Sequence, residues 1–96
     1  MNRLHISGTL IQVDPLRYSP AGVPIAEALI LHRSSQTVAA QPRLVECELA
    51  VQASGTLAAV LAQTTVGAQV QLDGVLNRRS VKSRQLVLIL NRIEKE

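Results

Sequence analysis

The segment NRRSVKSR, residues 77–84, concentrates positive charge in a way that no other part of this sequence does. It contributes four of the ten lysine and arginine residues: Arg78, Arg79, Lys82 and Arg84. Guanidinium and ammonium groups bind phosphate through charge-assisted hydrogen bonds, so such a cluster is typical of contact with a polyanion. The acids nearest to it in the sequence are Asp73 and Glu94, which leaves the local charge unbalanced. We therefore favour phosphate contact over a merely solvated loop.

Arg17 and Tyr18 are candidates for the same ligand. They lie in DPLRYSPAGVP, residues 14–24, whose prolines and glycine predict a loop. Tyr18 is the only aromatic residue of the chain, and its ring can stack on a nucleic-acid base or pack against the prolines of its own loop. The sequence leaves these two alternatives open.

Arg33 and Arg43 flank SSQTVAAQP, residues 34–42, which we expect to be a second loop. Each of these arginines can contact a phosphate or take part in a surface ion pair. Glu46 and Glu48 follow on one face of the next predicted strand, where they would either oppose phosphate or complement a basic protein partner. The sequence alone does not decide between these roles.

Catalysis and metal binding have little support in this sequence. Cys47 is the single cysteine, so an intrachain disulfide is impossible, and its alternating apolar surroundings predict a buried, reduced thiol. His5 and His32 have no partners at the spacing of zinc ligands, and Ser7 lies near His5 only through strand alternation. We expect no catalytic residue, no metal and no cofactor, and therefore no enzyme.

Composition places the candidate residues on one small globular domain, residues 1–96. Hydrophobic residues make up 47% of the chain and charged residues 18%, with a net charge of +3. Because Trp and Phe are absent, the core must consist of Leu, Val, Ile and Ala, and so light a core favours further burial in an oligomer. The first residues show no signal-peptide pattern, and the longest apolar run, LVLIL, is too short to span a bilayer. These features predict a cytosolic protein.

Alternating and helical patterns predict five strands and one short helix. We expect strands over residues 3–13, 25–33, 43–51, 68–76 and 85–93, and a helix of two or three turns within residues 54–64, capped by Ser54 or Thr56. The predicted inward-facing residues are Leu4, Ile6, Leu10, Ile25, Leu29, Leu31, Val45, Cys47, Leu49, Val51, Leu57, Val60, Leu61, Val70 and Leu72. The fifth strand is apolar on both faces, which predicts that both faces are covered.

Gly8 and Gly74 interrupt the first and fourth predicted strands where a core side chain would otherwise lie, which indicates tight bends. Five bent strands with a helix between the third and fourth predict an all-β fold with one short helix. The specific fold we expect is a five-stranded OB-fold Greek-key barrel of order β-β-β-α-β-β. In such a barrel, residues 77–84 form the loop between the last two strands, beside the ligand face.

Several segments of the chain resemble the primosomal replication protein N (PriB) family, whose members are OB-fold relatives of bacterial single-stranded DNA-binding protein. The resemblance rests on NRLHISGTL near the start, VECEL with its central cysteine, TVGAQVQLDGVL, and the final ILNRIE. Its most specific part is SPAGVPIAEALILHRS, residues 19–34. Together these segments cover nearly the whole chain.

The resemblance implies a non-enzymatic, homodimeric accessory protein for the restart of stalled DNA replication. It implies single-stranded DNA as the ligand, and the primosomal helicase of the PriA family and other primosome proteins as partners. It also implies a location in the bacterial cytoplasm, at the nucleoid during replication restart. The light core and the two apolar faces of the fifth strand agree with a homodimer.

One departure from the family pattern concerns DNA affinity. Relatives tend to present aromatic side chains on the third strand and the loop before it, whereas here Glu46 precedes Cys47 and AAQPRLV has no aromatic residue. Stacking contributes about 1–3 kcal/mol per base. We therefore expect weak binding that depends mainly on phosphates. The alternatives are a protein–protein adaptor of the primosome, with DNA contact secondary, and an RNA-binding OB domain.

Overall fold

The structure, a computed structural model, describes residues 1–96 and contains six strands and one helix. The elements are β1 (Leu4–Val13), β2 (Arg17–Tyr18), β3 (Pro24–Val38), β4 (Gln41–Ser54), α1 (Thr56–Gln63), β5 (Gln69–Arg78) and β6 (Leu86–Lys95). Apart from the two-residue β2, which lies within the predicted loop 14–24, this is the expected order β-β-β-α-β-β. The helix α1 has 8 residues, and a helix that crosses a membrane needs about 20.

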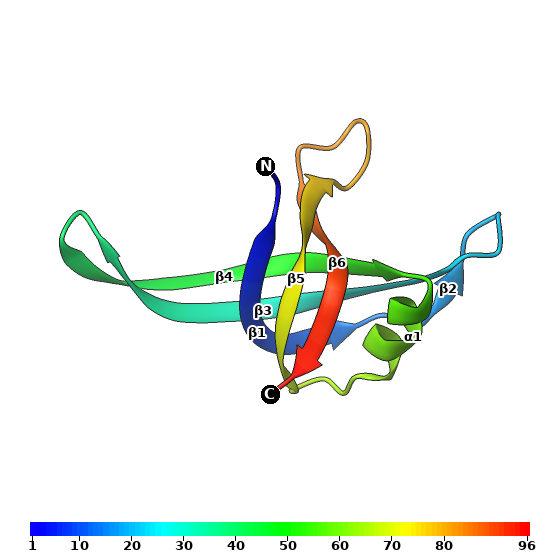
Figure 1. The fold of residues 1–96 in the computed structure, drawn as a ribbon, viewed down its shortest axis with the longest axis horizontal. Coiled ribbons are helices and arrows are strands. Elements are labelled where there is room, and N and C mark those ends of the chain that lie inside the picture. Colours follow the sequence, from blue (N-terminus) through cyan, green and yellow to red (C-terminus); the bar gives the residue numbers. More distant parts are fainter.

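The strand β1 closes the sheet into a barrel because it changes partners along its length (Figure 1). From Leu4 to Thr9 it pairs antiparallel with β5, and from Thr9 to Val13 it pairs antiparallel with β3. On the other side of the barrel, β4 and β6 form a short parallel pair at Val51 and Leu88. The sheet order β1-β5-β6-β4-β3-β2, with the extra β1–β3 pairing, confirms the predicted five-stranded OB-fold barrel.

Gly74 lies at the bend that the sequence predicts in β5. The pairing of β5 with β6 shifts register between Asp73 and Gly74, which marks a bulge. A Cβ atom at Gly74 would lie 2.1 Å from the backbone oxygen of Ile89, so no side chain fits there. At Gly8 the corresponding approach is 2.9 Å, to the backbone oxygen of Leu31. Both glycines therefore permit close contact between neighbouring backbones where the sheet curves.

The inward face of β3 is not the one we predicted. The buried residues are Ala26, Ala28 and Ile30, and the predicted Ile25, Leu29 and Leu31 are only half-buried on the opposite, outer face. Across the sheet the three buried residues face inward-pointing residues of β4, in the pairs Ala26–Ala53, Ala28–Val51 and Ile30–Leu49. The small side chains of Ala26 and Ala28 fit where β3 lies close to the barrel interior. The strand therefore packs better with its larger side chains on the outer face than with them inside.

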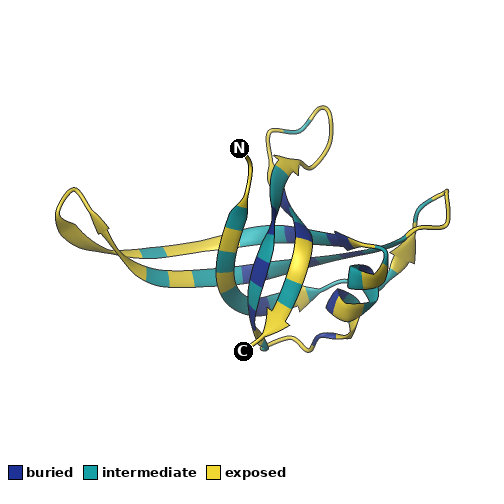
Figure 2. Cartoon of the chain, viewed as in Figure 1, coloured by how far each residue is buried: buried dark blue, intermediate teal, exposed yellow.

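The core lies between the barrel strands and α1, as the dark residues in Figure 2 show. Leu10, Val70 and Leu72 are fully buried as predicted, and on β6 residues of both faces are buried, including Val87 and Leu88. On α1 the buried residues are Ala58 and Leu61, whereas the predicted Val60 is exposed. The N-cap of α1 is Gly55 and no side chain caps it, so the expected cap by Ser54 or Thr56 is wrong.

A long hairpin extends from the barrel where the sequence predicted a loop at residues 34–42 (Figure 1). β3 and β4 remain paired without interruption from Ile25 and Ser54 out to Val38 and Gln41. A turn at Ala39 and Ala40 joins them, with φ angles of 52° and 63°. We call the outer part of this hairpin, residues 32–47, the arm.

The arm also explains why the prediction of a buried Cys47 is wrong. Cys47 has the inward parity of Val51 and Leu49, and it pairs with His32 across the hairpin. At this point, however, the hairpin has left the barrel, and no core lies beneath it (Figure 2). The thiol is therefore exposed.

Candidate nucleic-acid interface

The basic loop, residues 79–85, is an ordered connection between β5 and β6. Its ends are joined by a hydrogen bond of 2.9 Å from the backbone nitrogen of Arg79 to the backbone oxygen of Gln85. Within it, the backbone nitrogen of Ser83 donates to the oxygen of Ser80 at 3.1 Å, which forms a turn. The side chain of Arg78 donates to the oxygen of Val81 at 3.1 Å. These bonds constrain the loop backbone, and the charged side chains of the loop remain exposed to solvent.

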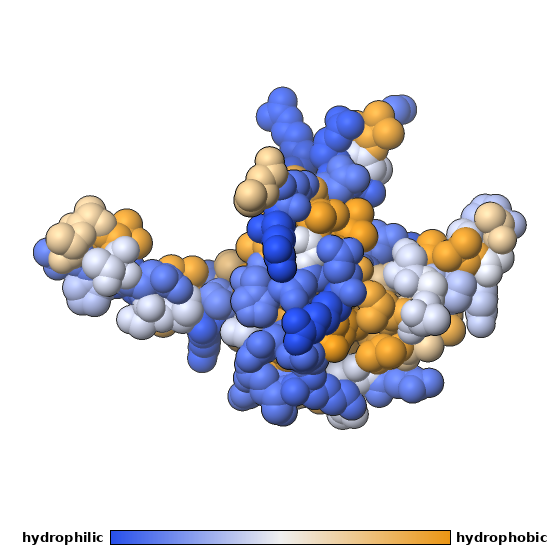
Figure 3. Space-filling model, in the orientation of Figure 1, coloured by the Kyte–Doolittle hydropathy of each residue, from blue (hydrophilic) through white to orange (hydrophobic).

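The four cations predicted for phosphate contact are all exposed on or beside this loop. They are Arg78, Arg79, Lys82 and Arg84. The basic loop projects from the barrel at the top of the view in Figure 3, where hydrophilic side chains predominate. None of the acids of the chain lies on the loop itself, so its charge is balanced only by neighbouring elements.

Glu27 on β3 is the neighbour that brings two of the predicted cations together. Nη2 of Arg17 on β2 lies 3.5 Å from Oε1 of Glu27, and Nη2 of Arg79 lies 3.5 Å from Oε2. One carboxylate therefore joins the basic loop to the hairpin that carries β2. We did not predict this role for Glu27. The sequence did contain an indication of this placement. Glu27 shares its face of β3 with Ile25 and Leu29, and a charged residue on that face indicates that it is the outer one.

Tyr18 lies next to Arg17 and pairs with Pro24 across the short β2–β3 ladder. Its backbone is followed by a tight turn in which the nitrogen of Ser19 donates to the oxygen of Val23 at 2.9 Å. Tyr18 as a residue is 65% exposed. The prolines of the loop therefore leave the ring accessible, and it can stack on a base.

Arg33 and Arg43 lie on the arm, apart from the basic loop. Nε of Arg33 donates to Oε2 of Glu46 at 2.6 Å, so Arg33 forms a cross-strand ion pair. Arg43 stands opposite Gln36 and is exposed with no ion pair. The arm and the β2 hairpin extend at opposite ends of the long axis of the molecule (Figure 1). The predicted site residues thus form two groups, one on the arm and one around the basic loop.

The two histidines take part in hydrogen bonds on the outer surface. His32 contacts the backbone oxygen of Ser7 at 2.6 Å through Nδ1, and His5 is bonded to Asp73 across the β1–β5 ladder. No group of three or more His, Cys, Asp and Glu residues is placed to hold a metal ion. Close by, the hydrogen bond and the charge of Glu94 raise the pKa of Arg92 above its ordinary value.

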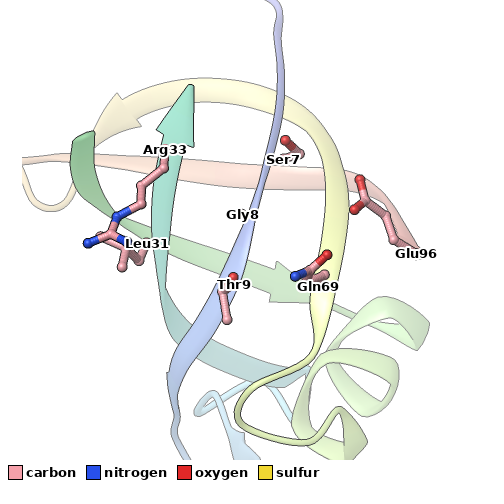
Figure 4. A pocket seen from close by; sticks show the side chains of 7 residues that line it. All are labelled: Ser7, Gly8, Thr9, Leu31, Arg33, Gln69 and Glu96. Atoms are coloured by element: carbon pink, nitrogen blue, oxygen red, sulfur yellow. The ribbon is translucent and has the colours of Figure 1, made fainter. Parts of the chain in front are cut away.

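A cavity of about 360 Å³ lies between β1 and the base of the arm (Figure 4). It is lined by Ser7, Gly8, Thr9, Leu31, Arg33, Gln69 and Glu96. Along its β1 side, residues 4–8 are paired with β5 only, because pairing with β3 begins at Thr9. The cavity therefore borders a strand edge whose backbone groups have no strand partner on that side.

Known proteins are similar to this chain over nearly its whole length. A family model described as "another single-strand binding protein family" matches residues 2–92. Replication restart protein PriB of Bordetella pertussis is 38% identical over 76 residues, which cover 79% of this chain and 71% of the relative.

Two solved structures are similar in fold. The protein PriB from Ralstonia solanacearum aligns with a TM-score of 0.89 and 30% identity, covering 100% of this chain and 99% of that one. The single-stranded DNA-binding domain of a Synechococcus protein aligns with a TM-score of 0.75 and 25% identity, covering 98% and 94%. These similarities extend from the barrel to the arm and the basic loop.

Proposed function

Because this chain belongs to the family of replication restart protein PriB, we propose that it binds single-stranded DNA during replication restart and has no enzymatic activity. The observation that carries the proposal is the exposed basic loop with Arg78, Arg79, Lys82 and Arg84, together with the exposed Tyr18 on β2. Cations on a protruding loop can follow the phosphates of a flexible strand, and an exposed aromatic ring can stack on one of its bases.

The proposed binding is weak and depends mainly on phosphates. Tyr18 is the only aromatic side chain available, and each stacked base contributes about 1–3 kcal/mol. Position 46 on the arm carries a glutamate, and this glutamate pairs with Arg33. The arm therefore offers neither a stacking ring nor a free guanidinium at this point, although Arg43 remains unpaired.

We further propose a homodimer that forms through the free edge of β1. We expected a dimer from the two apolar faces of β6, but the chain's own core already covers Val87, Leu88 and Leu90. The edge of β1 over residues 4–8 is a better reason, because it has no strand partner on the β3 side, and such an edge is a template for another strand. Within this edge the backbone oxygen of Ser7 is contacted by the His32 side chain. Two copies of β1 can pair antiparallel about a two-fold axis. The cavity in Figure 4 leaves room beside this edge.

A role as an adaptor is the second candidate, and the arm favours it. Its tip exposes the apolar side chains of Val38 and Leu44, the latter 74% exposed, while Glu46 and Glu48 lie nearer the barrel. Apolar anchors beside carboxylates suit a protein partner with a basic surface better than they suit DNA. In the proposed setting, the bacterial cytoplasm, that partner is the primosomal helicase or another primosome protein.

Titration of labelled single strands at low and physiological salt, with and without the helicase, tests both candidates. A DNA-binding protein loses affinity as salt rises, whether or not the helicase is present. An adaptor shows almost no binding of its own at physiological salt and binds only together with the helicase. Competition between single-stranded DNA and RNA in the same assay separates either candidate from an RNA-binding OB domain.

A further inference from the structure

The triad of Arg17, Glu27 and Arg79 places a protein carboxylate between two of the predicted phosphate contacts. Each arginine approaches a different oxygen of Glu27, at 3.5 Å in both cases. The three residues come from β2, β3 and the basic loop, so the cluster exists only in the folded chain. It connects the two loops that flank the proposed DNA-binding surface.

The two ion pairs of the triad are looser than another arginine–carboxylate contact in this chain. The Arg33–Glu46 pair is 2.6 Å long, and in the triad both distances are 3.5 Å. The side chains of Arg17 and Arg79 are 55% and 47% exposed, whereas that of Glu27 is 22% exposed. Each guanidinium has five N–H donors, so both retain donors that face solvent. The carboxylate is therefore less exposed than the two guanidinium groups.

A carboxylate and a phosphodiester present similar pairs of anionic oxygens to guanidinium groups. We propose that Glu27 holds the place of a DNA phosphate in the free protein and competes with it for Arg17 and Arg79, so that Glu27 limits the affinity for single strands. The inference rests on the proposed function, since it concerns the same basic loop. Glu27 is then a residue that sets affinity without touching DNA itself.

The competition has a distinct electrostatic signature. With Glu27 ionised, two arginines share one negative charge, and an incoming phosphate gains less than it would from two free cations. Removal of this charge should strengthen binding at low salt and also steepen its salt dependence. Each additional phosphate neutralised changes the log–log salt slope for single strands by about −0.7. If Glu27 only oriented the two arginines, its removal would not steepen the salt slope.

The test compares Glu27→Gln with a matched control, Glu94→Gln. Both variants remove one carboxylate that is paired with an arginine, but Glu94 lies near the far end of β6 from the basic loop. Labelled oligothymidylate is titrated at several salt concentrations. Glu27→Gln should bind about two- to tenfold more tightly at low salt, because exposed ion pairs are individually weak. Glu94→Gln should remain within about twofold of the parent, as expected for a distant, screened charge.

The double variant Glu27→Gln with Arg79→Ala completes the test. In the Arg79→Ala background the gain from Glu27→Gln should be smaller than in the parent, because only one of the two cations released by that change remains. If Glu27→Gln binds as the parent does, or more weakly, competition is wrong. Weaker binding by Glu27→Gln would mean that Glu27 orients the two arginines for DNA.

Failure of this inference is distinguishable from failure of the proposed function. If Lys82→Ala still weakens binding in the parent, the basic loop binds DNA and only the role of Glu27 is overturned. If neither the parent nor any variant shows salt-dependent binding, the proposed function itself is wrong. If circular dichroism shows that Glu27→Gln does not fold, the single variants Arg79→Ala and Lys82→Ala still test the competition. Competition requires that Arg79→Ala weaken binding less than Lys82→Ala, because Glu27 already partly neutralises Arg79.

Discussion

Arg79 and Glu27 are 52 residues apart in the sequence, and Nη2 of Arg79 lies 3.5 Å from Oε2 of Glu27. Arg17 approaches the other oxygen of the same carboxylate, so the basic loop, β3 and the β2 hairpin meet at Glu27. The candidate interface is therefore a composite of two loops and a strand. We therefore expect its binding properties to depend on charges that lie far apart in the sequence.

Replacement of Tyr18 should lower affinity without changing the salt dependence. Tyr18→Ala removes the only Phe, Tyr or Trp ring of the chain, and loss of one stacked base should weaken binding by about 1–3 kcal/mol. Because stacking releases no counterions, the log–log salt slope should stay the same. Fluorescence anisotropy with a labelled single strand measures both quantities.

The control for this substitution is Tyr18→Phe. It keeps the ring and removes only the hydroxyl group, so it should bind nearly as the parent does. If Tyr18→Ala binds as tightly as the parent, Tyr18 does not stack on DNA. In that case phosphate contacts alone account for the affinity.

A like charge on the free edge of β1 should weaken the proposed homodimer. Ser7 is exposed on this edge, and Ser7→Lys would place one ammonium group from each copy at the proposed interface. Like charges at a strand–strand interface should destabilise the dimer by up to about 1 kcal/mol. Gln63→Lys, on the exposed surface of α1, adds the same charge elsewhere and should leave the dimer intact. Light scattering over a concentration series measures the mass, and a monomer mass for the parent at micromolar concentration would overturn the proposal.

Gly74→Ala should destabilise the barrel strongly. The added Cβ would lie 2.1 Å from the backbone oxygen of Ile89, which cannot move without breaking the β5–β6 ladder. We expect the free energy of unfolding to fall by about 3 kcal/mol or more. Gly22→Ala is the comparison, because Gly22 has a φ of 81° but open space around it, and it should lose about 1–2 kcal/mol. Urea denaturation measures both, and a smaller loss for Gly74→Ala would contradict the close backbone approach.

Cys47 should react readily with a thiol reagent in the native protein. It lies on the arm, is exposed, and has no core beneath it. The rate of labelling should therefore be similar in native protein and in protein unfolded by urea. If Cys47 were labelled more than about tenfold more slowly in the native protein, another surface would cover this part of the arm.

The number, order and bends of the barrel strands could be predicted from the sequence. Strict alternation marks β1 and β4, and Gly8 and Gly74 indicate where backbones approach closely. The inward face of β3 could not be predicted from hydrophobicity, because its larger residues lie outside and its alanines lie inside. Glu27 was the informative residue on this strand, since an acid on the supposed core face should have reversed the assignment.

The length of the arm could not be predicted either. A two-residue hairpin turn with positive φ angles normally carries asparagine or glycine, and here the turn residues are Ala39 and Ala40. Without that signal, residues 34–42 look like a polar loop. The exposure of Cys47 follows from the same feature, because alternation predicts which face a residue is on, but not where the barrel ends. The placement of Arg33 beside Glu46 likewise depends on the register of the extended hairpin.

The salt dependence of single-strand binding, measured for the parent and for a variant with Ala at Arg78, Arg79, Lys82 and Arg84, tests the central proposal most directly. With about −0.7 per phosphate neutralised, three or four contacts should give the parent a log–log slope of roughly −2 to −3, and a steeper slope if both loops of a dimer engage. The variant should keep its fold, since these side chains lie outside the core. Its affinity should fall and its slope should become nearly flat. If the variant binds single strands at low salt as tightly as the parent, the basic loop is a solvated loop and not the DNA site.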